Sequence, residues 1–308
     1  MDARAGEHAP ALAPTAAPAP WRERAEPWFW LAPSLILLLG IGLYPSLYTL
    51  VTSFQYWVMT GGPPEWTWFD NYAEALTSSD FGGAVGRTLL LLAVTLPIEL
   101  ILGGLIALAL DSAHAPVLRR LLQVCLVIPI AITPAVVGLL TQLMFNEQLG
   151  VVNYGLARLG VPPVDWLGDP TMAFVTVLIV QVWEWTPFVA LVLSASLSTV
   201  PKDIEEAAML ETERWWPRFR GVVLPYMRPG ITAALVFQTA FTIKEFDTIY
   251  TIGRGGPGTA TETAIMQVER LAFRGFDIGV SSAESILLLV LSIVLARIYI
   301  RAFYQEAE

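Results

Sequence analysis

The chain has 308 residues, of which 55% are hydrophobic and only 15% are charged. Because about a quarter of the residues of a typical soluble domain are charged, this composition argues against a soluble protein and indicates one that lies in a lipid bilayer. The net charge of −9 and the lack of basic clusters argue against nucleic acid as a partner.

Few residues are suited to ligate a metal or to form a disulfide. Cys125 is the only cysteine, so no disulfide can form within the chain. His8 and His114 are far apart in the sequence and lack companion ligands. We therefore predict no metal site.

The first element, residues 1–27, is rich in alanine and proline up to residue 20 and shows no hydrophobic periodicity. This composition predicts a disordered or interfacial N-terminal segment on the cytoplasmic side. It does not resemble a signal peptide, because an apolar core before residue 28 is missing.

Apolar runs fill most of the remaining chain, and each is close to the roughly 20 residues that a helix needs to cross the hydrocarbon core. We predict six transmembrane helices, at residues 28–54, 88–110, 119–145, 171–197, 228–250 and 278–303. The expected fold is therefore an all-α integral membrane domain over residues 28–303, followed by a short cytoplasmic tail at 304–308.

Basic residues orient these helices. With the N-terminus inside, twelve Lys and Arg residues fall in cytoplasmic segments and five fall in outer segments. Cytoplasmic loops carry the excess of Lys and Arg in membrane proteins. We therefore expect a multi-pass protein of the bacterial inner membrane with both termini in the cytoplasm, and a cytoplasmic loop at 198–227.

The loop at 198–227 is amphipathic. Pro201 is followed by acidic residues, as at the start of a helix, and apolar residues such as Ile204 and Leu210 come next. A second short helix would carry aromatic residues between 215 and 219. An apolar surface on a cytoplasmic loop predicts a protein partner or contact with the bilayer face.

The same loop resembles the EAA motif of type I ABC importer permeases, which begins Glu-Ala-Ala and ends Leu-Pro. In that family the loop forms a coupling helix that docks on the ATPase subunit. The resemblance implies a coupling role for eight residues: Glu206, Ala207, Ala208, Glu211, Thr212, Phe219, Leu224 and Pro225. The family has Asp-Gly where this chain has Glu211-Thr212. Thr212 would be strained by about 1–3 kcal/mol if its φ were positive, or else the turn has another geometry.

Other segments resemble the carbohydrate branch of the same family. They are Phe69-Asp-Asn-Tyr72, Gly150-x-x-Asn153, Trp183-x-x-x-Pro187-Phe188, Phe246-Asp-x-Ile-Tyr250 and Gly255-Gly-Pro257. Their order along the chain favours a sugar permease over the amino-acid, metal and anion branches.

Polar and aromatic residues inside the predicted spans mark the candidate substrate pathway, because charge in a span usually faces a cavity or the bundle interior. The resemblance and the charges together select Glu184, Trp185, Phe188, Lys244, Glu245 and Asp247. Aromatic faces suit a sugar ring, and Lys244 would suit a sugar acid or glycerol phosphate. Alternatively, Lys244 and Asp247 pair structurally on one helix and the tryptophans merely pack.

The chain lacks the Gly-rich phosphate loop of an ATPase, and it has no nucleophile–His–acid set, so we predict that it is not an enzyme. The resemblance implies separate partners: a second permease, two ATPase subunits that hold ATP and Mg, an extracytoplasmic solute-binding protein and a carbohydrate substrate. The alternative is a self-sufficient secondary transporter or channel that uses the intramembrane charges.

Overall fold

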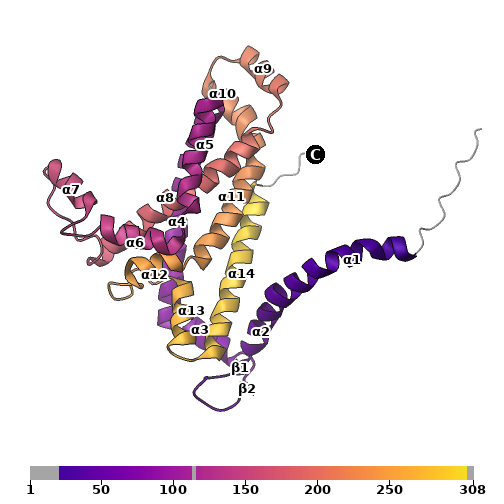
Figure 1. Cartoon of the computed structure of the whole chain (residues 1–308), viewed down its shortest axis with the longest axis vertical. Helices are drawn as coiled ribbons and strands as arrows, with labels where there is room; N and C mark the ends of the chain where they lie inside the picture. The colour runs from indigo at the N-terminus through magenta and orange to yellow at the C-terminus, as the bar shows by residue number, and fades with distance from the viewer. Residues whose placement is uncertain (1–20, 113–115, 304–308) are drawn as a thin grey trace, which may run out of the picture. The chain divides into compact units, whose positions relative to one another are not determined.

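The computed structural model describes residues 21–112 and 116–303, and Figure 1 shows their arrangement. Nearly all the described elements are helices. The long ones are α1 (Trp21–Leu37), α4 (Ser79–Ser112), α5 (Pro116–Ala131), α8 (Pro170–Leu197), α11 (Leu224–Lys244) and α14 (Ile278–Phe303). The shorter ones are η1 (Leu38–Leu43), α2 (Tyr44–Thr52), α3 (Asp70–Thr77), α6 (Pro134–Met144), α7 (Val151–Arg158), α9 (Lys202–Glu211), α10 (Trp215–Arg218), η2 (Phe219–Val223), α12 (Asp247–Gly253) and α13 (Ala264–Phe273).

The chain divides into two units, and along the sequence the boundary lies between Tyr48 and Thr49. The first unit consists of α1, the π-helical segment η1 and the start of α2. The helical backbone begins at Trp21, inside the predicted N-terminal segment 1–27, while residues 1–20 and the tail at 304–308 lie outside the described residues. The predicted domain boundaries therefore remain predictions.

Four described helical stretches are long and apolar enough to cross a membrane: Trp28–Thr52, α4, α8 and α14. A fifth is obtained if α5 and α6 form one broken span. These five coincide with predicted spans. The sixth predicted span, 228–250, falls on α11. This helix is not among the described helices that are long and apolar enough to cross a membrane, and it contains the polar residues Arg228 and Gln238.

Two of the predicted spans are not continuous helices. The span at 119–145 is bent by 92° between Ala131 and Pro134, because Thr133 adopts an extended backbone before the proline. The span at 228–250 ends at Lys244, and α12 begins at Asp247 after an extended residue, Glu245.

The second unit is built around α4, α8 and α11. Helix α4 packs along α8, and α11 packs against α8, α14 and α4. Gly103 permits a close approach of α4 to α8, since a Cβ there would lie only 2.8 Å from Cγ1 of Val189. Ala107, Leu193 and Leu197 continue this apolar contact toward the end of the bundle that carries α9 and α10.

A small hairpin, β1 (Gln55–Tyr56) and β2 (Glu65–Trp66), lies at the opposite end of the bundle from α9 and α10 (Figure 1). Asn71, from the Phe69-Asp-Asn-Tyr72 segment, fixes this end. Its buried amide donates hydrogen bonds to the carbonyl oxygens of Ser53 and Gln55, at 2.9 and 2.8 Å. Because a buried amide must be paired, the motif has a structural role here.

Candidate functional site

Four aromatic side chains form a continuous cluster across α8 and α11. The Trp185 and Phe241 rings are stacked, with their centroids 5.0 Å apart and an interplanar angle of 25°. Phe188 packs edge-on against Phe241 at 5.6 Å and against Phe237 at 6.3 Å. Phe237 is 53% exposed. The cluster therefore presents ring surface outside the packed core.

Lys244 lies at one end of this aromatic cluster. Its Nζ is 5.9 Å from the centroid of the Phe241 ring, within the range of a cation–π interaction. Lys244 and Asp247 are both exposed, and no ion pair joins them in the described part of the chain. The alternative in which these two residues pair on one helix does not hold, because the helix breaks at Glu245 and the two residues belong to α11 and α12.

Glu184 and Glu245 take no part in the exposed cluster. Both side chains are buried and meet at Thr248. The Thr248 hydroxyl donates to Oε2 of Glu184 at 3.4 Å, and its backbone N–H donates to Oε1 of Glu245 at 3.2 Å. The predicted pathway residues thus divide into the half-buried rings of Trp185 and Phe188, the exposed Lys244 and Asp247, and the buried carboxylates of Glu184 and Glu245.

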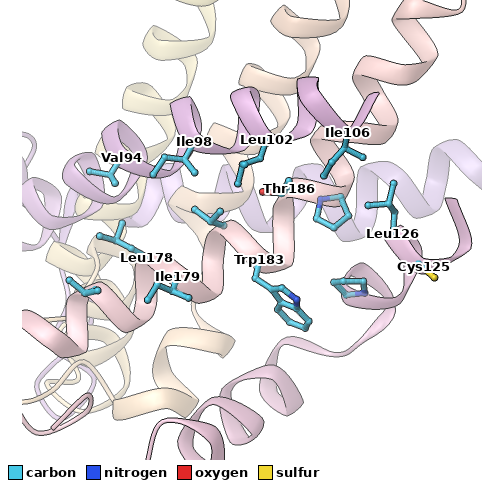
Figure 2. Close-up of a pocket in the computed structure, with 14 residues that line it drawn as sticks. Val94, Ile98, Leu102, Ile106, Cys125, Leu126, Leu178, Ile179, Trp183 and Thr186 are labelled. Carbon is cyan, nitrogen blue, oxygen red and sulfur yellow. The ribbon is translucent and has the colours of Figure 1, made fainter. Parts of the chain in front are cut away.

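A separate apolar pocket of about 680 Å³ opens between α4, α5 and α8 (Figure 2). In Figure 2 a row of side chains on α4, including Ile98, faces a row on α8 that includes Trp183, with Leu126 of α5 at one end. The lining offers few polar groups, such as the Thr186 hydroxyl. A sugar site needs several convergent polar groups, so the aromatic cluster is the better candidate.

The coupling loop, residues 198–227, contains α9, α10, η2 and the first residues of α11. Glu206 and Ala207 are exposed on α9, whereas Ala208 is 8% exposed and packed within the chain. Glu211 is also exposed and Thr212 partly so, while Phe219, Leu224 and Pro225 are half-buried. Of the Glu-Ala-Ala triplet, the first two side chains are available to a partner.

Thr212 closes α9 with φ −152° and ψ 130°, an extended conformation. Any residue with a Cβ adopts this backbone without strain. The glycine of the family motif is therefore not required for this turn, and the strain considered from the sequence is absent. The loop reverses through an extended residue instead of a left-handed one.

At the hairpin end, Arg270 of α13 connects several elements. Its Nε donates to Oε1 of Glu262 at 2.8 Å, and its Nη2 lies 3.3 Å from Oδ2 of Asp80 at the start of α4. The hydrogen bond to Glu262 raises the pKa of the Arg270 guanidinium above its ordinary value. Arg87 donates to the backbone carbonyl of Glu262, so the same loop is held from α4 as well.

The family described as the inner membrane component of binding-protein-dependent transport systems matches residues 99–304. The chain belongs to this family. It is a transporter permease, as the loop motif predicted, and this family is not one of enzymes. The family description agrees with the inner membrane expected from the sequence.

Two relatives of this permease illustrate its similarity. It is 32% identical over 272 residues to the sulfoquinovosyl glycerol transport system permease protein SmoG of Agrobacterium fabrum, and 88% of each chain is covered. It is 32% identical over 284 residues to the trehalose/maltose transport system permease protein MalF of Thermococcus litoralis, over 91% of this chain and 94% of that one.

The fold of the permease also matches a solved structure. A chain from a bacterial ABC transporter that imports the acidic polysaccharide alginate superposes with a TM-score of 0.79 at 22% identity, over 94% of this permease and 99% of that chain. The predicted type I ABC importer permease fold is therefore confirmed.

Sequence reasoning missed two members of the permease's aromatic cluster, Phe237 and Phe241. They are four residues apart, so they lie on one face of α11. Trp185 and Phe188, which were predicted, are three apart on α8. The spacing of three or four residues on each of the two helices could have indicated all four aromatic residues. On a membrane helix, however, the same spacing is also typical of a face turned to lipid.

Proposed function

We propose that this permease forms half of the translocation pathway of an ATP-driven carbohydrate importer. A second permease would complete the pathway, two ATPase subunits would hold ATP and Mg, and an external binding protein would deliver the substrate. The coupling loop and both termini would lie in the cytoplasm. The observation that carries the carbohydrate assignment is the partly exposed aromatic cluster on α8 and α11.

The chemistry of the cluster supports a sugar. A sugar ring has one face rich in C–H groups, which packs on aromatic rings, and hydroxyls that need polar partners. Trp185, Phe188 and Phe241 would supply the ring surface. Lys244 would donate to hydroxyls, or to the carboxylate of a sugar acid. Both relatives described above are named for glycosidic substrates, which supports the same class.

The buried carboxylates and the coupling loop would have different roles. Glu184 and Glu245 would hold the start of α12 in place through Thr248, behind the cluster. Asp247, exposed beside them, would line the pathway. On α9, Glu206 and Ala207 would contact the ATPase subunit, while Ala208 would keep α9 packed on its own loop.

Two neighbouring tryptophans on α8 provide a test. In the full complex, reconstituted with its binding protein, Trp185→Ala should lower sugar transport about tenfold, the equivalent of roughly 1.4 kcal/mol of lost contact. Trp183→Ala is the matched control, because Trp183 is 48% exposed and faces the apolar pocket. A panel of neutral and acidic sugars identifies the substrate by its stimulation of ATP hydrolysis.

Equal losses in both variants would contradict a sugar contact at Trp185. The alternative, a self-sufficient transporter, predicts uptake by this chain alone that collapses with the proton gradient. Its proposed relay is poorly supported by the geometry, because the hydrogen bonds of the described chain join Glu184, Thr248 and Glu245 but do not extend to Lys244 or Asp247.

A further inference from the structure

An exposed stack of aromatic rings lies in the second half of the coupling loop. The Trp215 and Phe219 rings are 4.9 Å apart at 16°, and the Trp216 and Phe219 rings are 5.7 Å apart at 25°. Trp215 is 50% exposed and Trp216 is 60% exposed. Two large indole rings in contact with solvent outside a packed core indicate a surface that another molecule covers.

Positive charge surrounds this stack. Arg214, Arg218 and Arg220 lie within six residues of the two tryptophans, and Arg214 and Arg220 are exposed. Among the residues that the structure describes, none of the three forms an ion pair. The acidic residues of α9 and the neighbouring Glu213, although close in sequence, therefore form no ion pair with these arginines.

The stack begins where the spanning helices end. Phe219 and Val223 pack against the apolar cluster that Leu193 and Leu197 form at the end of α8. From Val223 onward the helical backbone continues directly into α11. Indole rings beside arginines at the end of a span are typical of the membrane–water interface, where the ring suits the apolar boundary and the guanidinium suits phosphate.

We propose that Arg214, Trp215, Trp216, Arg218 and Arg220 bind the headgroups of anionic phospholipids in the leaflet on the coupling-loop side. The guanidinium groups contact lipid phosphates, and the two indoles lie at the level of the glycerol backbones. The loop then has two partners: α9 faces the ATPase subunit and α10 faces the bilayer. Only the assignment of this leaflet to the cytoplasm rests on the proposed function.

Titration of lipid onto the purified permease tests this surface, with native mass spectrometry to count bound lipids. Wild type should bind phosphatidylglycerol more tightly than phosphatidylcholine. In the double variant Arg214→Gln/Arg220→Gln, phosphatidylglycerol affinity should fall by about 30-fold, which is about fivefold for each arginine. The charge-keeping variant Arg214→Lys/Arg220→Lys should retain most of the preference.

The double variant Arg158→Gln/Arg254→Gln is the matched control, since it removes the same charge from exposed arginines elsewhere. Lack of a phosphatidylglycerol preference in wild type, or equal losses in control and test variants, overturns the proposal. If the Arg214→Gln/Arg220→Gln variant kept the full preference for phosphatidylglycerol but failed to assemble with the ATPase subunits, the surface would be a protein contact instead. Because the lipid measurement needs no ATPase, its failure leaves the proposed importer function standing.

Discussion

The hairpin end and the coupling-loop end of this permease use their charges differently. At the hairpin end, Arg270 pairs with Glu262 and Asp80, and Arg274 lies 3.6 Å from Glu269. In the coupling loop, acidic α9 and basic α10 lie next to each other, yet no ion pair forms between residues 201 and 225 of the described chain. One end satisfies its charges internally; the other presents them outward.

This difference indicates where the permease is stable by itself and where it depends on partners. Pairing within the chain holds Glu262, whose side chain is only 9% exposed, and thereby fixes the loop before α13. Unpaired charge on an exposed helix contributes little to stability but gives specificity to an interface. Substitutions at the hairpin end should therefore act on folding, and those in the loop on assembly.

The largest effect is expected at Glu206. Reversal of its charge in Glu206→Lys should lower association with the ATPase subunits at least about 30-fold, because loss of a charged contact in an interface costs about 2–5 kcal/mol. SDS titration of the isolated permease should give a free energy of unfolding within about 0.5 kcal/mol of wild type, since Glu206 is exposed. Co-purification measures the association.

Glu213→Lys is the control for this experiment, because it makes the same charge change on an exposed residue just beyond α9. Association that is unchanged in Glu206→Lys, or equally weakened in both variants, would remove the coupling role from Glu206. A large loss of stability in the isolated chain would instead break the contrast between the two ends.

At the hairpin end, Arg270→Gln should lower the free energy of unfolding by about 1–2 kcal/mol. The value is modest because the Arg270 side chain is 43% exposed and solvent screens its charge, although Glu262 is left nearly buried without its partner. The difference from wild type should shrink as salt increases. SDS titration at low and high ionic strength measures both.

The sign of the pH dependence follows from the raised pKa of Arg270. A group whose pKa is raised in the folded state stabilises that state as long as the group is protonated. This stabilisation is lost only as the pH rises through the raised pKa. Because arginine already titrates far above neutrality, the effect of Arg270→Gln should be the same between about pH 6 and 9. Arg158→Gln, at an exposed arginine, serves as control; an equal loss there would argue against the pairing.

The sequence predicted the helical architecture well, because long apolar runs and the excess of basic residues report directly on the bilayer. It failed at helix breaks. The bend before Pro134 was signalled by the proline, but prolines are also tolerated within spans. The break after Lys244 has no proline or glycine. It depends on Glu245 accepting a hydrogen bond from the backbone of Thr248, which local composition does not reveal.

The candidate site shows the same limit. Trp185 and Phe188 were found through a motif, and their ring contacts are present in the structure. Phe237 and Phe241 were missed because an apolar helix offers no local sign of which face meets another helix. The alternative pairing of Lys244 with Asp247 assumed continuous helical spacing, which the break at Glu245 interrupts. Contacts between helices depend on register, which the sequence of one helix does not contain.

The smallest expected effect concerns Thr212, where this chain departs from the glycine of the family motif. Since Thr212 is extended, Thr212→Gly relieves no strain and adds flexibility to the unfolded chain. The free energy of unfolding should stay unchanged or fall by about 0.5–1 kcal/mol. Glu213→Gly, one residue further, is the control for flexibility alone. A gain in stability specific to Thr212→Gly would show that the backbone of this turn is strained. It would contradict the extended, unstrained conformation of Thr212.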